Sequence, residues 1–161
     1  DSSNWNTKSV KYLNKSFEGC TSLRIIEGIE NWNTSNIINM NASFKNCCSL
    51  EDLSGISKWD ISKVVTTKEA FYNCTLLKKV LIYYWKCDNL KDSSFMFRGC
   101  VCLDDDSILN ILENVENVYG IVENCFQLIS NELCHFYTNG KDKRKKLKDE
   151  IIKVLKKKRP K

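Results

Sequence analysis

The sequence predicts an α/β fold, a right-handed solenoid of four to five helix–strand coils with a short parallel sheet and a basic C-terminal helix. Three observations predict it: a repeat of 25 to 27 residues, apolar positions with helical spacing inside each copy, and a strongly basic final segment. The chain has 161 residues, which fits one domain, and its 42% hydrophobic content is typical of a folded protein.

Four residue types recur with one period. The series are Trp5, Trp32, Trp59 and Trp85; Phe17, Phe44, Phe71 and Phe97; Cys20, Cys47, Cys74 and Cys100; and Leu23, Leu50, Leu77 and Leu103. Their spacings are 27, 27 and 26 residues. A weaker copy follows 25 residues later, with Val122, Cys125 and Leu128 but no tryptophan. One such copy cannot bury its apolar face alone, so stacking of neighbouring copies is expected to build a continuous core.

The spacing of apolar residues inside each copy predicts a helix. In the second copy these residues are Ile37, Met40, Phe44 and Cys47, with gaps of 3, 4 and 3 positions. Such gaps place side chains on one face of a helix. The stretches "WNTK", "WNTS" and "WDIS" precede the apolar residues and offer acceptors for the free amides of a first helical turn.

A Gly or Asn residue ends each predicted helix. These residues are Gly19, Asn46, Asn73, Gly99 and Asn124. Gly and Asn share a tolerance of left-handed backbone, so each is predicted to have a positive φ as the residue that follows the helix. The cysteine after it is expected to fold back onto the helix end as a small apolar contact.

A short strand is predicted after each cysteine, bracketed by two inward apolar residues such as Leu50 and Leu53. Strands of successive copies are expected to lie parallel, about 4.8 Å apart. The outward positions vary between copies while the core positions do not, which favours a ligand- or partner-binding face. Its residues are Ile25, Glu27, Asp52, Ser54, Lys79 and Leu81.

The stretch "WNTSNIINMNASFKNCCSL" resembles the repeat of the BspA-like leucine-rich repeat proteins, including the 25–27-residue repeats of mycoplasma surface proteins. The resemblance covers roughly residues 4–128, and copy four departs from it with "WKCDNL" and with Asp106 where a core Leu is expected. It implies a leucine-rich-repeat-like solenoid that binds other macromolecules, commonly at a cell surface, with no catalytic residues to transfer. Residues 1–139 would form this solenoid, with coils starting near residues 5, 32, 59, 85 and 111.

Residues 140–161 are predicted to form a basic amphipathic helix or tail. Residues 141–161 hold 12 of the 25 basic residues and 3 of the 20 acidic ones, so they carry +9 while residues 1–140 carry −4. An apolar face with Leu147, Ile151, Val154 and Leu155 favours a helix that caps the open end of the solenoid. A cationic arm for an anionic partner is the alternative. Its residues would be Lys143, Arg144, Lys145, Lys146, Lys156, Lys157, Lys158 and Arg159.

Nine cysteines raise the questions of disulfides and metal. Five of them occupy the repeated position after Gly or Asn, which favours a ladder of buried thiols. An odd number leaves at least one thiol without an intramolecular partner, and no CxxC pair indicates a zinc site. The lone histidine, His135, is interpreted as a polar residue near a coil end, and residues 104–106 (DDD) as a solvated turn. The sequence therefore predicts no enzyme, no cofactor and no metal.

The main hypothesis is a monomeric, non-enzymatic repeat domain that binds a protein or glycan, as an adhesin or interaction module. The alternative is an intracellular assembly or nucleic-acid-associated factor that binds nucleic acid or a membrane surface through the basic tail. No run of residues approaches the length that crosses a bilayer. The chain starts at Asp1 without a methionine or signal segment, so a processed product or fragment is expected. The resemblance implies a cell-surface location, and the residues alone leave the compartment open, cytoplasm included.

Overall fold

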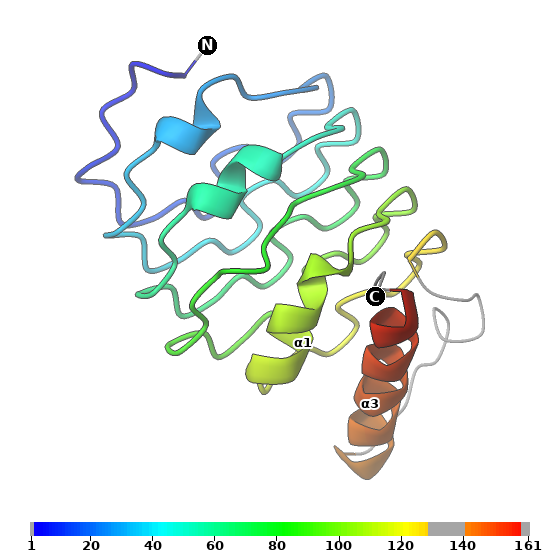
Figure 1. The fold of residues 1–161 in the computed structure, drawn as a ribbon. Coiled ribbons are helices and arrows are strands. Elements are labelled where there is room, and N and C mark those ends of the chain that lie inside the picture. Colours follow the sequence, from blue (N-terminus) through cyan, green and yellow to red (C-terminus); the bar gives the residue numbers. More distant parts are fainter. Residues whose placement is uncertain (1, 129–140, 159–161) are drawn as a thin grey trace.

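The computed structural model describes residues 2–128 and 141–158. Five copies of the repeat lie side by side, and each makes one turn of the chain (Figure 1). They are copy one (residues 5–31), copy two (32–58), copy three (59–84), copy four (85–110) and copy five (111–128). We call residues 5–128 the coil stack.

Regular helices are few within the described residues. Three short 3-10 helices occur, η1 (Ile29–Asn31), η2 (Ser54–Lys58) and η3 (Asp106–Ile108). Two α-helices follow, α1 (Leu109–Asn114) and α3 (Lys141–Lys158). The coil stack is otherwise built of turns and short extended pieces.

The predicted α/β class with a parallel sheet is wrong. In residues 2–128 and 141–158 there is no strand, and the only strand-type pairing between neighbouring copies consists of isolated parallel bridges. The bridged pairs are Tyr12 and Asn39, Asn39 and Thr66, Thr66 and Asp92, Asp92 and Asn117, and Asp52 and Lys79. The stretch between tryptophan and cysteine, predicted to be a helix, is a run of turns in each of copies one to four.

A second left-handed residue in each copy prevents the predicted helix. The predicted positive φ is confirmed at Gly19, Asn46, Asn73, Gly99 and Asn124, with values of 58° to 79°. Four residues earlier the chain is left-handed again, at Lys15, Ala42, Glu69, Phe95 and Gly120, with φ of 54° to 62°. An α-helix needs consecutive right-handed residues, so a helix cannot pass through these positions.

Hydrogen bonds between copies take the place of helical ones. Alternate amides of copy two donate to copy three: Met40, Ala42, Phe44 and Asn46 lie 2.8–3.0 Å from the carbonyl oxygens of Thr66, Lys68, Ala70 and Tyr72. The amides between them close tight turns, as Ser43 N does to Met40 O at 3.2 Å. These bonds give acceptors to the amides of the buried residues Met40, Ser43 and Phe44, as a buried backbone requires.

The predicted strand stretch is too short to form a ladder. Glu51 N donates to Arg24 O at 3.1 Å and Lys78 N donates to Glu51 O at 3.0 Å. In copy two the chain then enters η2 directly after Leu53. A strand needs a run of alternating pairs with its neighbour, and the turn that begins at Leu53 ends the run.

Stacked aromatic rings form the core. The rings of Phe17, Phe44, Phe71 and Phe97 follow one another at centroid distances of 5.2, 5.6 and 5.2 Å. The indoles of Trp5, Trp32 and Trp59 stack at 5.5 and 5.7 Å. Equivalent residues thus lie above one another along the stack, which is the arrangement that offset aromatic stacking favours.

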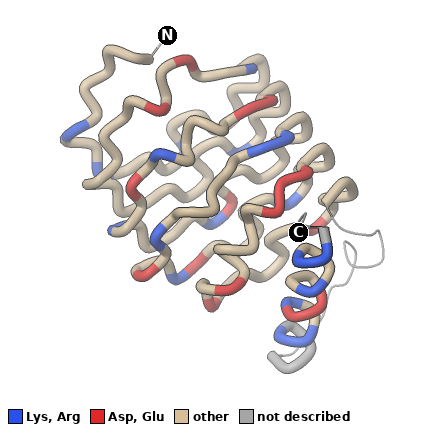
Figure 2. Tube along the Cα trace, viewed as in Figure 1, with Lys and Arg blue, Asp and Glu red and all other residues tan. Residues whose placement is uncertain are grey.

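Helix α3 covers the C-terminal end of the coil stack, where it packs against α1 and η3 (Figure 1). Leu155 and Ile151 are buried beneath it. Lys156 pairs with Glu113 of α1 at 2.5 Å, and Lys148 Nζ donates to Val115 O at 2.9 Å. On its exposed side one acidic pair, Asp149 and Glu150, lies between lysines (Figure 2). The apolar stripe at every fourth residue explains why this charged segment docks as a helix.

Candidate partner-binding face

The six residues predicted for a partner-binding face lie in two rows across the copies. Ile25, Asp52 and Lys79 hold equivalent positions in copies one to three, and Glu27, Ser54 and Leu81 form the second row. All are exposed except Ser54, which is half-buried. The bridge between Asp52 and Lys79 places these two residues next to each other. We call these six residues the partner face.

Backbone contacts hold the partner face in place. Asp52 Oδ1 accepts from Ser54 N at 2.6 Å, which fixes the turn at the start of η2. Lys78 Nζ and Glu51 Oε2 pair beside it at 3.4 Å. Exposed ion pairs of this kind contribute little stability, so the ordering of this face comes from the backbone bonds.

A buried carboxylate fixes the end of the partner face. Asp105 Oδ2 accepts from Val80 N at 2.6 Å and from Leu81 N at 2.7 Å, and its Oδ1 accepts from Ser107 N at 2.9 Å. Asp105 is buried, so the prediction of a solvated turn at residues 104–106 is wrong for this residue. The carboxylate holds Leu81 in a left-handed conformation with φ of 54°.

Two exposed tyrosines extend this surface and were not predicted. Tyr84 is 88% exposed and Tyr83 is 40% exposed. The Tyr83 hydroxyl donates a hydrogen bond to Asp106. The ring centroids of Tyr83 and Tyr84 lie 6.5 Å apart. A comparison of the copies could have found them. The two residues before Trp85 are tyrosines, whereas the two residues before Trp59 are the polar pair Ser57 and Lys58.

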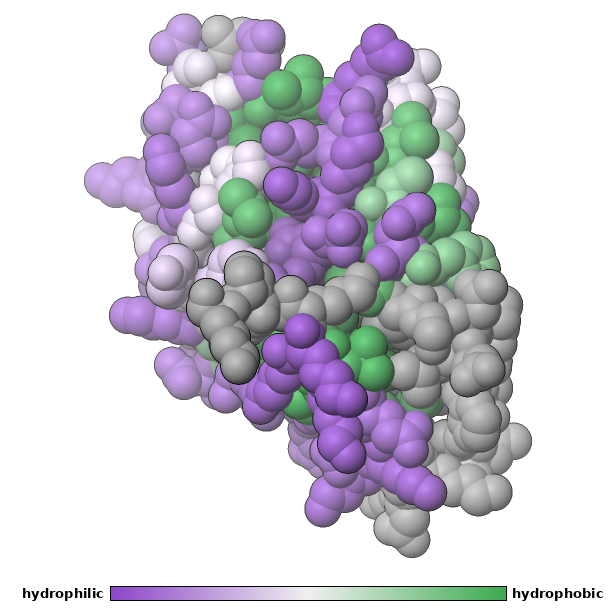
Figure 3. Space-filling model, turned by 45° about the vertical axis from the view of Figure 1, so that its right-hand side comes forward, coloured by the Kyte–Doolittle hydropathy of each residue, from purple (hydrophilic) through white to green (hydrophobic). Residues whose placement is uncertain are grey.

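The basic tail is partly described. Lys145, Lys146, Lys156 and Lys157 are exposed on α3, and so is Lys153. Lys143, Arg144 and Lys158 lie within α3, but their side chains fall outside the description, as does the whole of Arg159. Asp149 and Glu150 lie among these lysines and reduce the local charge. Figure 3, which brings this end of the molecule forward, shows it as largely hydrophilic.

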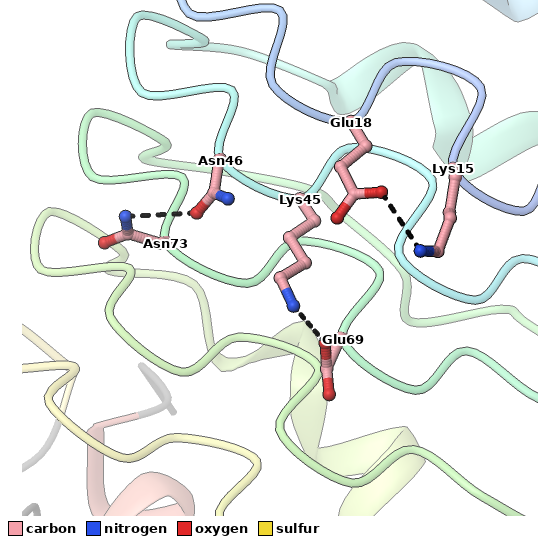
Figure 4. A network of polar contacts seen from close by, with 6 residues as sticks. All are labelled: Lys15, Glu18, Lys45, Asn46, Glu69 and Asn73. Atoms are coloured by element: carbon pink, nitrogen blue, oxygen red, sulfur yellow. Dashed lines mark hydrogen bonds and ion pairs between the residues drawn. The ribbon is translucent and has the colours of Figure 1, made fainter.

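Charged and amide side chains join copies two and three, beside an ion pair between Lys15 and Glu18 within copy one (Figure 4). Lys45 Nζ pairs with Glu69 Oε2 at 2.5 Å, and Asn73 Nδ2 donates to Asn46 Oδ1 at 3.3 Å. The hydrogen bond that Lys45 donates to Glu69 raises the pKa of Lys45 above 10.5. The Lys45–Glu69 and Asn46–Asn73 contacts both cross between copies two and three, which indicates a role in holding these two copies together.

The cysteines are arranged for packing rather than for chemistry. The eight described cysteines are free thiols, and the ladder members Cys47, Cys74, Cys100 and Cys125 are buried. Burial raises the pKa of Cys47 to about 12. No group of His, Cys, Asp or Glu in the described part of the chain is placed to hold a metal ion. Cys134 and His135 lie outside the described residues.

The fold and this surface define a repeat protein of stacked coils whose exposed residues vary from copy to copy. The family model that matches the chain is described as "Mycoplasma protein of unknown function, DUF285", and it matches twice, at residues 1–110 and 24–133. The chain belongs to this family. No curated protein and no solved structure matches the chain. No helix among the described residues is long and apolar enough to span a bilayer.

Proposed function

We propose that the protein is a non-enzymatic interaction module, an adhesin-type domain that binds a protein or glycan through the partner face. The observation that carries this proposal is the exposure of apolar side chains among charged ones. Ile25 is 59% exposed and lies in one row with Asp52 and Lys79. Leu81 is 36% exposed and lies in the other row with Glu27 and Ser54. Exposed apolar residues rimmed by charges are typical of binding surfaces.

Tyr83 and Tyr84 support the proposal because tyrosine is enriched among the residues that dominate binding energy. A tyrosine ring also packs on the apolar face of a sugar while its hydroxyl remains hydrogen-bonded. The resemblance to the BspA-like leucine-rich repeat proteins agrees with a binding role at a cell surface. We include both tyrosines in the proposed site beside Leu81.

The test reverses one charge on the partner face. Wild-type protein is applied to a printed glycan array and to a protein array, and each ligand found is measured against Lys79→Glu. The matched control is Lys91→Glu, a second exposed lysine that lies outside the partner face. A loss of affinity of about tenfold or more in Lys79→Glu alone supports the proposal. Equal effects of the two variants, or no ligand on either array, contradict it.

A second candidate function rests on the exposed lysines of α3. Leu155 and Ile151 of this helix are buried against the coil stack, so deleting the helix would also uncover the core. Charge reversal is therefore the better test. The variant Lys146→Glu/Lys153→Glu/Lys157→Glu is compared with Lys8→Glu/Lys11→Glu/Lys86→Glu, which reverses three exposed lysines of the coil stack.

The probes for this second candidate are heparin and a single-stranded RNA oligonucleotide. An anionic partner is supported if only the α3 variant loses affinity and if wild-type affinity falls steeply with salt. If both variants lose affinity equally, the attraction is a general effect of net charge and not a site on α3.

A further inference from the structure

Four charged residues form a row across copies one to four, and their signs alternate. Glu51 N donates to Arg24 O at 3.1 Å, and Lys78 N donates to Glu51 O at 3.0 Å. Asp104 N donates to Lys78 O at 3.1 Å, so backbone hydrogen bonds hold each of these residues beside the next. We call Arg24, Glu51, Lys78 and Asp104 the charged row. In Figure 2 blue and red segments alternate from copy to copy along this part of the coil stack.

The charged row lies at the surface, beside the partner face. Three of its residues are exposed, and Glu51 is half-buried. Asp52 and Lys79 of the partner face carry the same signs as their chain neighbours Glu51 and Lys78. Copy two therefore presents a negative band on this side of the molecule, and copy three presents a positive one.

The ion pair within the charged row leaves both of its side chains accessible. Lys78 Nζ and Glu51 Oε2 lie 3.4 Å apart, and the two side chains are 61% and 43% exposed. An ion pair so exposed contributes little stability. By contrast, the side chains of the Lys45–Glu69 pair, which also joins copies two and three, are about a quarter exposed. The charges of the row are thus open to a second molecule.

We propose that the charged row binds a second copy of this chain, turned end for end, in a two-fold symmetric dimer. Copy one would then face copy four of the second chain, and copy two would face copy three. Each facing pair joins opposite signs, Arg24 to Asp104 and Glu51 to Lys78, and each pair occurs twice by symmetry. Ile25, which is 59% exposed beside Arg24, would add an apolar contact at each end. The proposal rests on the proposed function, because it takes the partner face and the row beside it as a protein-binding surface.

A second copy matches this pattern in both sign and spacing. The stacked phenyl rings of successive copies are 5.2–5.6 Å apart, so the charges recur at about this interval. Side chains on one face of an extended peptide recur about every 6.6 Å, which falls out of register over four copies. An identical stack has the same interval by construction. If the second stack ran in the same direction, equal copies would face each other and like charges would repel.

Sedimentation equilibrium of the full chain tests the dimer. Wild-type protein is expected to show a monomer–dimer equilibrium that weakens as salt is added, because exposed charges are screened. Glu51→Lys and Lys78→Glu are each expected to weaken dimerisation about tenfold or more, because each places like charges opposite each other at both central pairs. The matched control Lys91→Glu changes an exposed lysine outside the row and is expected to dimerise as the wild type does. The same measurement decides between this dimer and the monomer expected from the sequence.

Mixing the two variants separates a contact between chains from an effect within one chain. In a heterodimer of Glu51→Lys with Lys78→Glu, the new lysine of one chain faces the new glutamate of the other, and the unchanged Lys78 faces the unchanged Glu51. The mixture is therefore expected to recover the wild-type affinity to within about threefold. A wild type that stays monomeric up to its solubility limit, or a mixture as weak as the separate variants, overturns the proposal. If the wild type is monomeric while Lys79→Glu still loses a ligand found on the arrays, this inference fails and the proposed function stands.

Discussion

The thiol of Cys74 donates a hydrogen bond to the carbonyl oxygen of Phe44, 3.0 Å away in the preceding copy. The same bond recurs from Cys47 to Phe17 and from Cys100 to Phe71, each at 3.0 Å. This hydrogen bond requires a protonated sulfur. Burial raises the pKa of Cys74 and Cys100 and so keeps both thiols protonated. The repeated cysteine therefore acts as a small buried donor that links copies, and not as a nucleophile.

The cysteines are expected to differ widely in their rate of alkylation. Burial raises the pKa of Cys47 to about 12, so the reactive thiolate form of Cys47 is scarce near neutral pH. Cys20 is exposed. We expect N-ethylmaleimide to modify Cys20 at least about a hundredfold faster than Cys47 or Cys74 in the native protein, as measured by mass spectrometry.

Denaturant supplies the control, because all three thiols should react at similar rates once the chain is unfolded. Rapid native alkylation of Cys74 would show that the ladder is open to solvent, contrary to the buried positions of these sulfurs.

The left-handed residue of each turn is expected to tolerate Gly and to resist β-branched residues. Asn46 has φ of 62°, and its Oδ1 accepts from Asn73 Nδ2 at 3.3 Å. Asn46→Gly and Asn46→Val both lose that bond, so the comparison isolates the backbone. We expect Asn46→Val to be less stable than Asn46→Gly by more than about 1 kcal/mol in urea unfolding. Equal stabilities would mean that the turn adapts without a left-handed residue.

The sequence was sufficient to find the repeat, the positive φ after each turn and the buried Phe, Cys and Leu positions, because these follow from residue types at fixed spacing. It misled on secondary structure because 3-, 4- and 3-residue gaps suit a chain of turns as well as a helix. The deciding residues, Lys15, Ala42, Glu69 and Phe95, are left-handed without being Gly or Asn. Their conformation is set by hydrogen bonds to the next copy, which propensity does not report.

For the partner face, too, the sequence predicted some features and missed others. Alternation between inward and outward residues correctly indicated exposure at Ile25, Asp52 and Lys79. It could not indicate that Asp105 turns inward, because the acceptor role of this carboxylate depends on amides of Val80 and Leu81 about 25 residues earlier. A buried carboxylate that accepts three backbone amides resembles an exposed one in sequence.

The Lys45–Glu69 pair is expected to contribute stability that is lost at high pH. The hydrogen bond that Lys45 donates to Glu69 raises the pKa of Lys45 above 10.5 in the folded state. The contribution is then fully present below pH 10.5 and disappears as the pH rises through the folded pKa. Both side chains are about a quarter exposed, so we expect less than about 1 kcal/mol.

The measurement compares the free energy of unfolding of wild type and Lys45→Met at neutral pH and well above pH 10.5. The wild-type advantage should shrink between the two conditions, while other titrating groups cancel. An advantage that grows with pH would contradict the direction of the pKa shift.

Leu155 is expected to be the residue of α3 on which the covering of the coil stack depends most. Its side chain is fully buried, while Lys153 on the same helix is exposed. We expect Leu155→Ala to lower the free energy of unfolding by about 2–4 kcal/mol, because it removes buried methyl groups and leaves a cavity. Lys153→Ala, the matched control, should change the free energy of unfolding by less than about 0.5 kcal/mol.

Both variants are measured by urea unfolding, with circular dichroism following helix and tryptophan fluorescence following the coil stack. If helix is lost at lower urea than the fluorescence signal in Leu155→Ala, α3 detaches before the stack unfolds. Similar small effects of both substitutions would show that α3 does not cover the end of the stack.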